Sequence, residues 1–192
     1  MRWDDLFADL AAQWEAQARR ELDGEVADRT RRERALVRLS DRLVAAVGCR
    51  LGLVLVAAGA IAGRVLEVGD GWVLVADEAG GPALVPLAAI TGVTGLPSGV
   101  DGAGASRRFD LGHALRGVSR DRSAVLVTVL DGTVLSGTID AVGRDALELS
   151  EHPADLPRRA GNVTGRRLVP FAAVVLLRPG RGAGAQGAQS WP

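Results

Sequence analysis

An internal repeat constrains this chain more than any other feature of its sequence. The apolar segments 53–75 and 127–149 match each other at a spacing of 74 residues. A Leu-Val-Pro stretch follows each of them, at 84–86 and at 168–170, with a spacing of 84 residues. The second copy therefore holds about ten extra residues, in the segment 151–167. A chain that repeats a short apolar pattern is expected to build one small structural unit twice.

Each copy has the composition of short strands joined by tight turns. Val, Ile and Leu are dense, and the Asp131-Gly132 pair between β-branched residues is a hairpin signal. Gly63 and Gly137 match between the copies, and we expect both at sharp strand bends where a Cβ atom would crowd a neighbouring strand. A further strand is expected at 83–93, with a proline that suits an edge or a strand start.

Residues 1–47 have helical periodicity. Apolar side chains recur at steps of three and four, with charged residues between them at spacings that allow ion pairs along a helix. Gly48 is a plausible stop for this helical region. The aromatic stripe on its first part consists of Trp3, Phe7, Leu10 and Trp14. We expect the stripe to pack on the chain's own strands or to form an interaction face for another protein or a second copy.

The composition along the chain predicts five regions. The segment 97–122 is rich in Gly and Arg, and its later part predicts a short helix over 109–118. The C-terminal segment is of low complexity and is expected to be disordered. The regions are a helical region at 1–47, a first small β-barrel at 48–96, a connector at 97–122, a second small β-barrel at 123–178 and a tail at 179–192.

The strand pattern of the second copy resembles the first motif of Sm-like proteins. The matching positions are Asp131, Gly132, Gly137, Asp145 and 147–149. The resemblance implies, for each copy, a preceding helix and a strongly bent, five-stranded barrel. The RNA-contacting Asn of the family is Glu148 in the second copy and Leu74 in the first, and its Arg-Gly is replaced by Val-Pro in both. The resemblance therefore implies the barrel without the family's uridine pocket.

Two other resemblances compete with this one. Barrels of the RimM-type PRC family share the Gly-punctuated strands and a closing strand with a Val-Pro pair. The opening stretch MRWDDLF resembles that of a family of actinobacterial proteins, some of which are described as Fis-type transcriptional regulators. That description implies a C-terminal helix-turn-helix, whereas the C-terminal part of this chain has a strand pattern and a tail.

The composition argues against several classes of function. One Cys and two His, at 113 and 152, argue against a disulfide framework and a metal centre. Neither His lies in a catalytic motif, and a phosphate loop needs a Lys that the chain lacks. We therefore expect no enzyme, no cofactor and no metal. The longest apolar run is too short for a membrane span and the acidic N-terminus is unlike a secretory signal, so we expect a cytoplasmic protein without a membrane partner.

Arginine supplies all 23 basic residues and is balanced by 23 acidic residues. A codon bias explains this preference better than phosphate recognition does. The best local candidate for nucleic acid is the extra segment of the second copy, whose neighbourhood in the sequence has few acids. The candidate residues are Arg158, Arg159, Arg166 and Arg167.

The sequence thus predicts an α+β protein with an N-terminal helical region followed by two tandem small Sm-like β-barrels. The leading hypothesis is a non-catalytic binding module that acts as an RNA- or ribonucleoprotein-associated regulator. The alternative is a protein–protein interaction scaffold without nucleic-acid binding, whose partner is another protein or a second copy, held through the N-terminal helix or the barrel edges. A continuous Arg patch favours the first hypothesis, and a surface of mixed charge favours the second.

Overall fold

The computed structural model describes residues 35–78, 81–97, 109–156 and 158–180, together with Trp14 and Gln17. The chain divides into two units, Met1–Arg38 and Leu39–Pro192. In the first unit, Trp14 and Gln17 have helical backbone conformation, and the Trp14 side chain is exposed.

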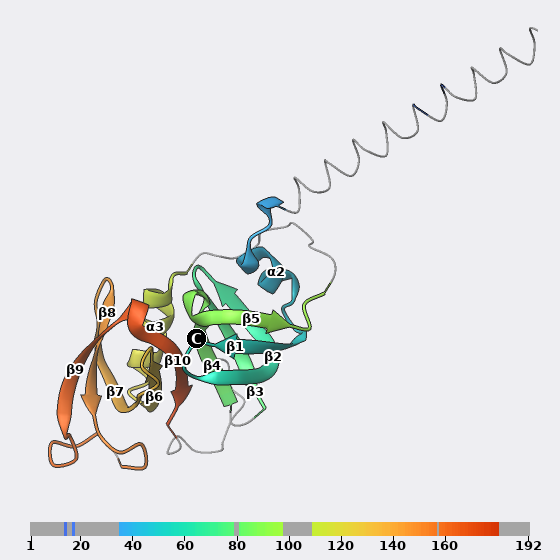
Figure 1. Ribbon diagram of the computed structural model, residues 1–192. Coiled ribbons are helices and arrows are strands. Elements are labelled where there is room, and N and C mark those ends of the chain that lie inside the picture. The colour runs from blue at the N-terminus through green and yellow to red at the C-terminus, as the bar shows by residue number, and fades with distance from the viewer. Residues whose placement is uncertain are drawn as a thin grey trace, which may run out of the picture. The chain divides into compact units, whose positions relative to one another are not determined.

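The second unit is an antiparallel sheet with two helices, which confirms the predicted α+β class (Figure 1). In chain order the elements are α2 (Leu39–Ala45), β1 (Arg50–Leu55), β2 (Gly59–Gly69), β3 (Trp72–Asp77), β4 (Gly81–Pro86), η1 (Leu87–Ala89), β5 (Ile90–Thr94), α3 (Leu111–Arg120), β6 (Ala124–Val129), β7 (Val134–Val142), β8 (Ala146–Glu151), β9 (Gly165–Pro170), η2 (Phe171–Ala173) and β10 (Val174–Pro179). We call residues 39–97 the first half and residues 109–180 the second half.

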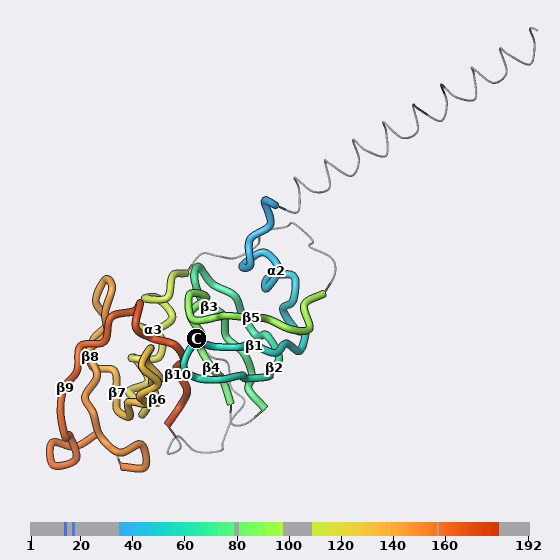
Figure 2. Tube along the Cα trace, viewed as in Figure 1, coloured from blue at the N-terminus to red at the C-terminus, as the bar shows by residue number. Residues whose placement is uncertain are grey.

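The two halves repeat one topology, as the sequence repeat predicts (Figure 2). In each half a helix precedes five strands, and the fifth strand returns to pair with the first. The registers agree residue by residue: Leu53 lies opposite Val93 in the first half, and Val127 opposite Leu177 in the second. The repeat therefore extends from the sequence to the hydrogen-bonded pairing.

The second strand of each half is bulged at the same place. The register shifts between Val65 and Glu67 in β2, and between Ile139 and Ala141 in β7. A bulge bends a strand and increases its twist. The matched glycines, Gly63 and Gly137, each lie two residues before a bulge. Both copies therefore bend at the same place in the strand.

The expectation of two separate closed barrels is corrected by the pairing between the halves. The strands form one continuous open sheet in the order β5-β1-β2-β3-β4-β10-β6-β7-β8-β9. The fourth strand of the first half, β4, pairs with the fifth strand of the second half, β10, with Leu84 opposite Leu177. The two halves are thus joined through this pair of strands, and the sheet ends at β5 and β9.

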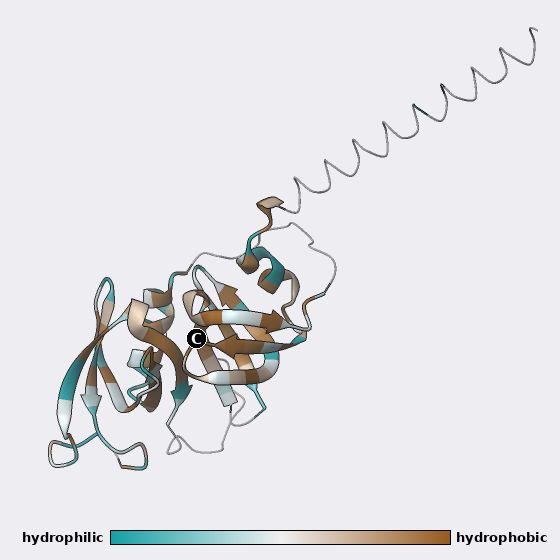
Figure 3. Ribbon diagram, viewed as in Figure 1, coloured by the Kyte–Doolittle hydropathy of each residue, from teal (hydrophilic) through white to brown (hydrophobic). Residues whose placement is uncertain are grey.

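The halves also share their cores, because β3 and β10 are buried on both faces. Side chains alternate between the two faces of a strand. In β3, Val73 and Val75 belong to the first core, whereas Trp72 and Leu74 belong to the second. Figure 3 shows the hydrophobic colouring of these inner strands, in contrast to the hydrophilic stretch of β9. Burial on both faces is why these strands lack an apolar–polar alternation.

One local prediction is confirmed and one is wrong. The helix predicted over 109–118 is α3, which Asp110 caps by accepting a hydrogen bond from the His113 backbone N–H at 2.7 Å. The single strand expected at 83–93 is instead two strands, β4 and β5. Pro86 ends the first of them in extended conformation, and the turn η1 then redirects the chain.

Candidate functional site

The predicted arginines lie on β9 and on the loop before it, next to strands β7 and β8. We call Arg158, Arg159, Arg166 and Arg167 the arginine surface. Arg158 Nη2 donates to Asp140 Oδ2 at 2.8 Å and lies 3.5 Å from Ser150 Oγ. Ser150 Oγ in turn donates to the same carboxylate at 2.5 Å. Burial raises the pKa of Asp140, but the hydrogen bonds from Arg158 and Ser150 outweigh burial and hold this pKa below its usual range.

The second arginine with a carboxylate partner is Arg167. Its Nε donates to Glu151 Oε1 at 2.6 Å, and this hydrogen bond raises the pKa of the guanidinium. Glu151 ends β8 and pairs with Gly165 at the start of β9, so the ladder itself brings acid and base together. Arg167 is 54% exposed, so the pair is a surface contact of small energetic weight.

The other two arginines form no ion pair within the described part of the chain. Arg159 contributes its backbone carbonyl, which accepts a hydrogen bond from the Asn162 N–H at 2.8 Å. Arg166 lines a shallow pocket of about 250 Å³, together with Asp140, Glu148 and Leu168. The arginine surface is therefore interleaved with three carboxylates.

The expectation of few acids near this segment is thus wrong. The acids Asp140 and Glu148 are distant from Arg166 in the sequence, but the antiparallel ladder β7-β8-β9 places them beside it. Counting charges along the sequence could not reveal these acids, because they become neighbours of Arg166 only through the pairing of strands.

Only one residue of the predicted aromatic stripe lies within the described part of the chain. Trp14 is 75% exposed, while Trp3, Phe7 and Leu10 lie outside the described residues. The proposed packing of this stripe stays a prediction.

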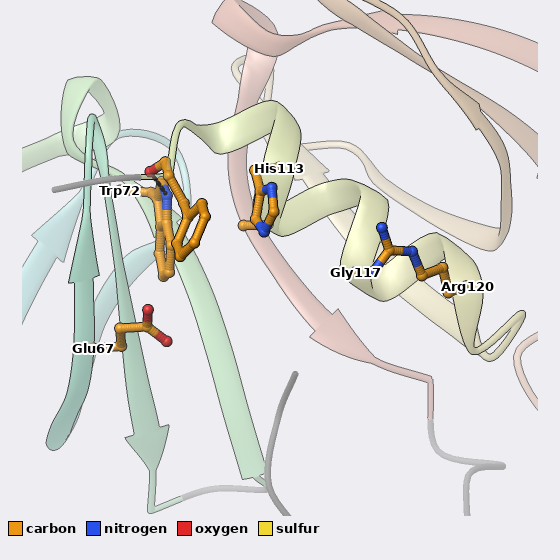
Figure 4. Close-up of a pocket in the computed structure, with 7 residues that line it drawn as sticks. Glu67, Trp72, His113, Gly117 and Arg120 are labelled. Atoms are coloured by element: carbon orange, nitrogen blue, oxygen red, sulfur yellow. Dashed lines mark hydrogen bonds between the residues drawn. The ribbon is translucent and has the colours of Figure 1, made fainter. Parts of the chain in front are cut away.

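A pocket of about 320 Å³ lies between β2, β3 and α3, and the sequence analysis did not identify it. Figure 4 shows Glu67 on the strand side and His113, Gly117 and Arg120 along the helix. Trp72 also lines the pocket, and its side chain is only 3% exposed. Beside it, the rings of Phe109 and His113 stack with their centroids 4.1 Å apart.

Hydrogen bonds to the Phe109 carbonyl connect the N-terminal end of α3 to the first half. This carbonyl accepts a hydrogen bond from the Asp70 N–H at 2.9 Å. It also accepts one from Trp72 Nε1 at 3.0 Å (Figure 4). The only signal for this contact in the sequence is the position of Phe109 directly before the predicted helix. The pocket is lined by an exposed aromatic pair, one acid and one base. The main role of its lining residues is to connect the two halves.

Of the two histidines, His152 lies inside the fold. His152 is buried, with Nε2 2.8 Å from Thr138 Oγ1 and Nδ1 2.8 Å from the Pro153 carbonyl. Since a carbonyl only accepts, Nδ1 is the donor in the contact with Pro153. Thr138 is also buried, so this pair is a contact inside the fold rather than an exposed nucleophile and base.

The described residues contain neither a cluster of metal ligands nor a membrane-spanning helix. No group of three or more His, Cys, Asp or Glu side chains in the described ranges is placed to hold a metal ion. Among the helices of these ranges, none has the length and apolar character needed to cross a membrane.

No model of a protein family matches the chain, and no curated protein matches its sequence.

Proposed function

We propose that the chain is a non-catalytic protein–protein interaction module built from two tandem Sm-like units. The Sm-like assignment of each half is supported by the helix before five antiparallel strands, by the bulged second strand and by the return of the fifth strand to the first. These features agree with the resemblance at Asp131, Gly132 and Gly137.

The mixed charge of the arginine surface is the observation that favours protein over RNA. Asp140 and Glu151 engage Arg158 and Arg167 directly, and Glu148 lies beside Arg166. An RNA phosphate that approached these guanidinium groups would displace a carboxylate or be repelled by it. No stacked aromatic platform of the kind used for RNA bases accompanies these arginines in the described pocket on β8 and β9.

The ends of the sheet supply surfaces that suit a protein partner. Strands β5 and β9 each have one neighbour in the sheet, so each presents a row of backbone donors and acceptors on its other side. A partner strand can add to such an edge through main-chain hydrogen bonds, with pockets or apolar side chains providing specificity.

The test is binding of single-stranded RNA of mixed sequence, measured at several salt concentrations. The wild-type chain is compared with a variant in which Arg158, Arg159, Arg166 and Arg167 are changed to Gln. A matched control carries Arg116→Gln and Arg120→Gln in α3. We expect no binding at low salt, or salt slopes that are the same for all three proteins.

The opposite result would favour the RNA hypothesis. Four lost phosphate contacts would flatten the log–log salt slope by about 3, since each contact on a single strand contributes about 0.7. Such a change in the quadruple variant alone, with an unchanged unfolding midpoint, would replace the protein-interaction proposal with an RNA-binding role.

A further inference from the structure

The pocket of about 320 Å³ between β2, β3 and α3 is bordered by both halves of the chain. Glu67 and Trp72 come from strands of the first half, whereas the other lining residues belong to the segment 109–120 of the second half. This volume is within the range of cavities that hold small molecules. A ligand bound here contacts both halves at once.

The strand wall of the pocket does not follow from the repeated fold. The spacing of 74 residues places Ala141 and Ala146 of the second half at the positions equivalent to Glu67 and Trp72. Glu67 and Ala141 each follow the bulge of their strand. Trp72 and Ala146 each begin the third strand of their half. The fold thus accommodates alanine at both positions, so the acid and the indole are an addition of the first half.

One face of α3 forms the opposite wall. His113, Gly117 and Arg120 follow each other at steps of four and three residues, which places them on the same side of the helix. A glycine in a helix interior destabilises the helix relative to alanine. At Gly117 the missing side chain leaves room beside the cavity. The residue that is least favourable for the helix thus lies where the pocket needs space.

The rings of Phe109 and His113 form a flat aromatic surface in the pocket. They stack with an angle of 17° between the ring planes. Phe109 is 44% exposed, and His113 is exposed as well. The hydrogen bonds from Asp70 and Trp72 to the Phe109 carbonyl hold the backbone beside this ring in place. A preformed aromatic surface favours a planar ring, because little entropy is lost when the two stack.

Glu67 and Arg120 bring opposite charges to the pocket. Glu67 lies on the strand side, and Arg120 lies at the C-terminal end of α3 (Figure 4). Among the described residues, neither side chain has an ion-pair partner. An unpaired acid and an unpaired base that line one cavity can each bind a ligand group of the opposite charge.

We propose that this pocket binds a small zwitterionic aromatic molecule, in which a planar ring separates a protonated amine from a carboxylate. The ring stacks on Phe109 and His113, the amine donates to Glu67, and the ligand carboxylate accepts from Arg120. Seven residues of helix span about 10 Å, so one ring fits between His113 and Arg120. A nucleotide fits this pocket less well, because Glu67 repels its phosphate. The site goes beyond the protein-interaction function proposed above and does not depend on it.

The first experiment titrates the full chain, labelled with nitrogen-15, with 4-(aminomethyl)benzoate as the probe. We expect saturable shifts of the Trp72 indole N–H and the Gly117 amide in the NMR spectrum. The dissociation constant should be on the order of 1 mM or tighter, as ligands of this size reach. Because the walls belong to different halves, the probe should also raise the midpoint of thermal unfolding.

Three related probes separate the parts of the proposed contact. Benzylamine lacks the carboxylate, benzoate lacks the amine, and 4-(aminomethyl)cyclohexanecarboxylate keeps both charges but lacks the planar ring. Each of them should bind about fivefold or more weakly than 4-(aminomethyl)benzoate. Equal binding of the cyclohexane compound would contradict the stacking.

The second experiment repeats these titrations with variants of the two charged residues. Arg120→Gln should weaken binding of the zwitterion and of benzoate about fivefold to tenfold and leave benzylamine unchanged. Glu67→Gln should weaken the zwitterion and benzylamine and leave benzoate unchanged. Arg116→Gln is the matched control, since it removes a cation from the same helix outside the pocket. It should bind every probe as the wild type does.

Gly117→Ala separates an effect on the pocket from an effect on folding. Alanine favours the helix, so the midpoint of thermal unfolding of the ligand-free chain should rise. The added methyl group takes space beside the cavity, so binding of every probe should weaken about threefold or more. A loss of affinity in a more stable protein cannot result from unfolding.

Three results would overturn this inference. One is the absence of saturable shifts with 4-(aminomethyl)benzoate at concentrations on the order of 10 mM. Another is a set of charge variants that change all probes alike. The third is tighter binding of uridine 5′-monophosphate than of the zwitterion, which would assign the pocket to a nucleotide. None of these results changes the salt slope of the RNA measurement, so this inference and the protein-interaction function can fail separately.

Discussion

At the scale of single residues, the fold depends on two glycines that lie where strands approach each other closely. A Cβ atom on Gly63 would meet the Ala76 carbonyl oxygen, and one on Gly137 would meet the Ser150 carbonyl oxygen. Both obstacles are backbone atoms, which cannot rotate away as a side chain can. The matched glycines of the repeat are therefore required by sterics in both halves.

Gly137→Ala is accordingly expected to lower the free energy of unfolding by about 1–3 kcal/mol, because the neighbouring strand has to shift. Gly165→Ala is the matched control in the same sheet, since a Cβ atom there meets nothing within 4 Å. Urea unfolding measures both. Equal midpoints for the two variants would contradict the steric explanation.

Asp140 is the residue whose ionisation should affect stability most clearly. Its pKa is lowered in the folded chain by Arg158 and Ser150, against the effect of burial. A carboxyl group with a lowered folded pKa adds stability above its unfolded pKa of about 3.9 and loses that contribution as the pH falls through the lower folded pKa.

Asp140→Asn should therefore destabilise the chain at pH 7, and the difference from the wild type should shrink below about pH 4. Urea unfolding between pH 3 and pH 7 checks this expectation. Arg158→Gln should reduce the same acid dependence, because it removes the guanidinium partner. A difference between wild type and Asp140→Asn that is constant across this pH range would contradict the assignment.

At the scale of elements, the strand pair β4–β10 decides how the halves are joined. The carboxylate of Asp77 is 5% exposed and is paired with Arg178, which is 35% exposed. Removing Arg178 takes the guanidinium away from a largely buried carboxylate, which is costly in the folded state.

Arg178→Ala should lower the free energy of unfolding by about 2–4 kcal/mol, somewhat less than for a fully buried pair because the guanidinium is partly hydrated. The double variant Asp77→Asn with Arg178→Met removes both charges and should recover part of the loss. Chemical unfolding of the three proteins measures these effects. A loss in Arg178→Ala within the error of the measurement would show that the ion pair contributes nothing to the junction.

At the scale of the whole second unit, the core of each half is completed by residues of the other half. Val175 and Leu176 of the second half complete the first core, and Trp72, Leu74 and Leu84 of the first half complete the second core. Units of this size bury too little surface to be robust alone. The two halves should therefore unfold together.

This cooperativity can be measured with Trp72 as the probe of the second core. In a chain with Trp3→Phe, Trp14→Phe and Trp191→Phe, tryptophan fluorescence follows that core, and far-ultraviolet circular dichroism follows the whole sheet. The two unfolding curves should coincide, as a two-state transition requires. A fluorescence transition separate from that of the sheet would show that the halves fold independently.

The features that depend on residues close in the sequence could be predicted from the sequence alone. Glycine and turn chemistry located the hairpin at Asp131-Gly132, where Gly132 has φ of 84°. Helical periodicity located α3, and the spacing of matched residues revealed the repeat. Each of these signals is local or compares one stretch of sequence with another, so no knowledge of spatial neighbours was needed.

Only the tertiary structure decided how the repeats combine and what surrounds the arginine surface. Leu84 and Leu168 stand in the same Leu-Val-Pro context, yet one is 1% and the other 66% exposed, because β10 covers only the first. Asp140 meets Arg158 across strands rather than along one. Strand pairing joins residues that are far apart in the sequence, and several strand edges of this chain have similar local sequences. Which two edges pair therefore depends on how the whole chain folds.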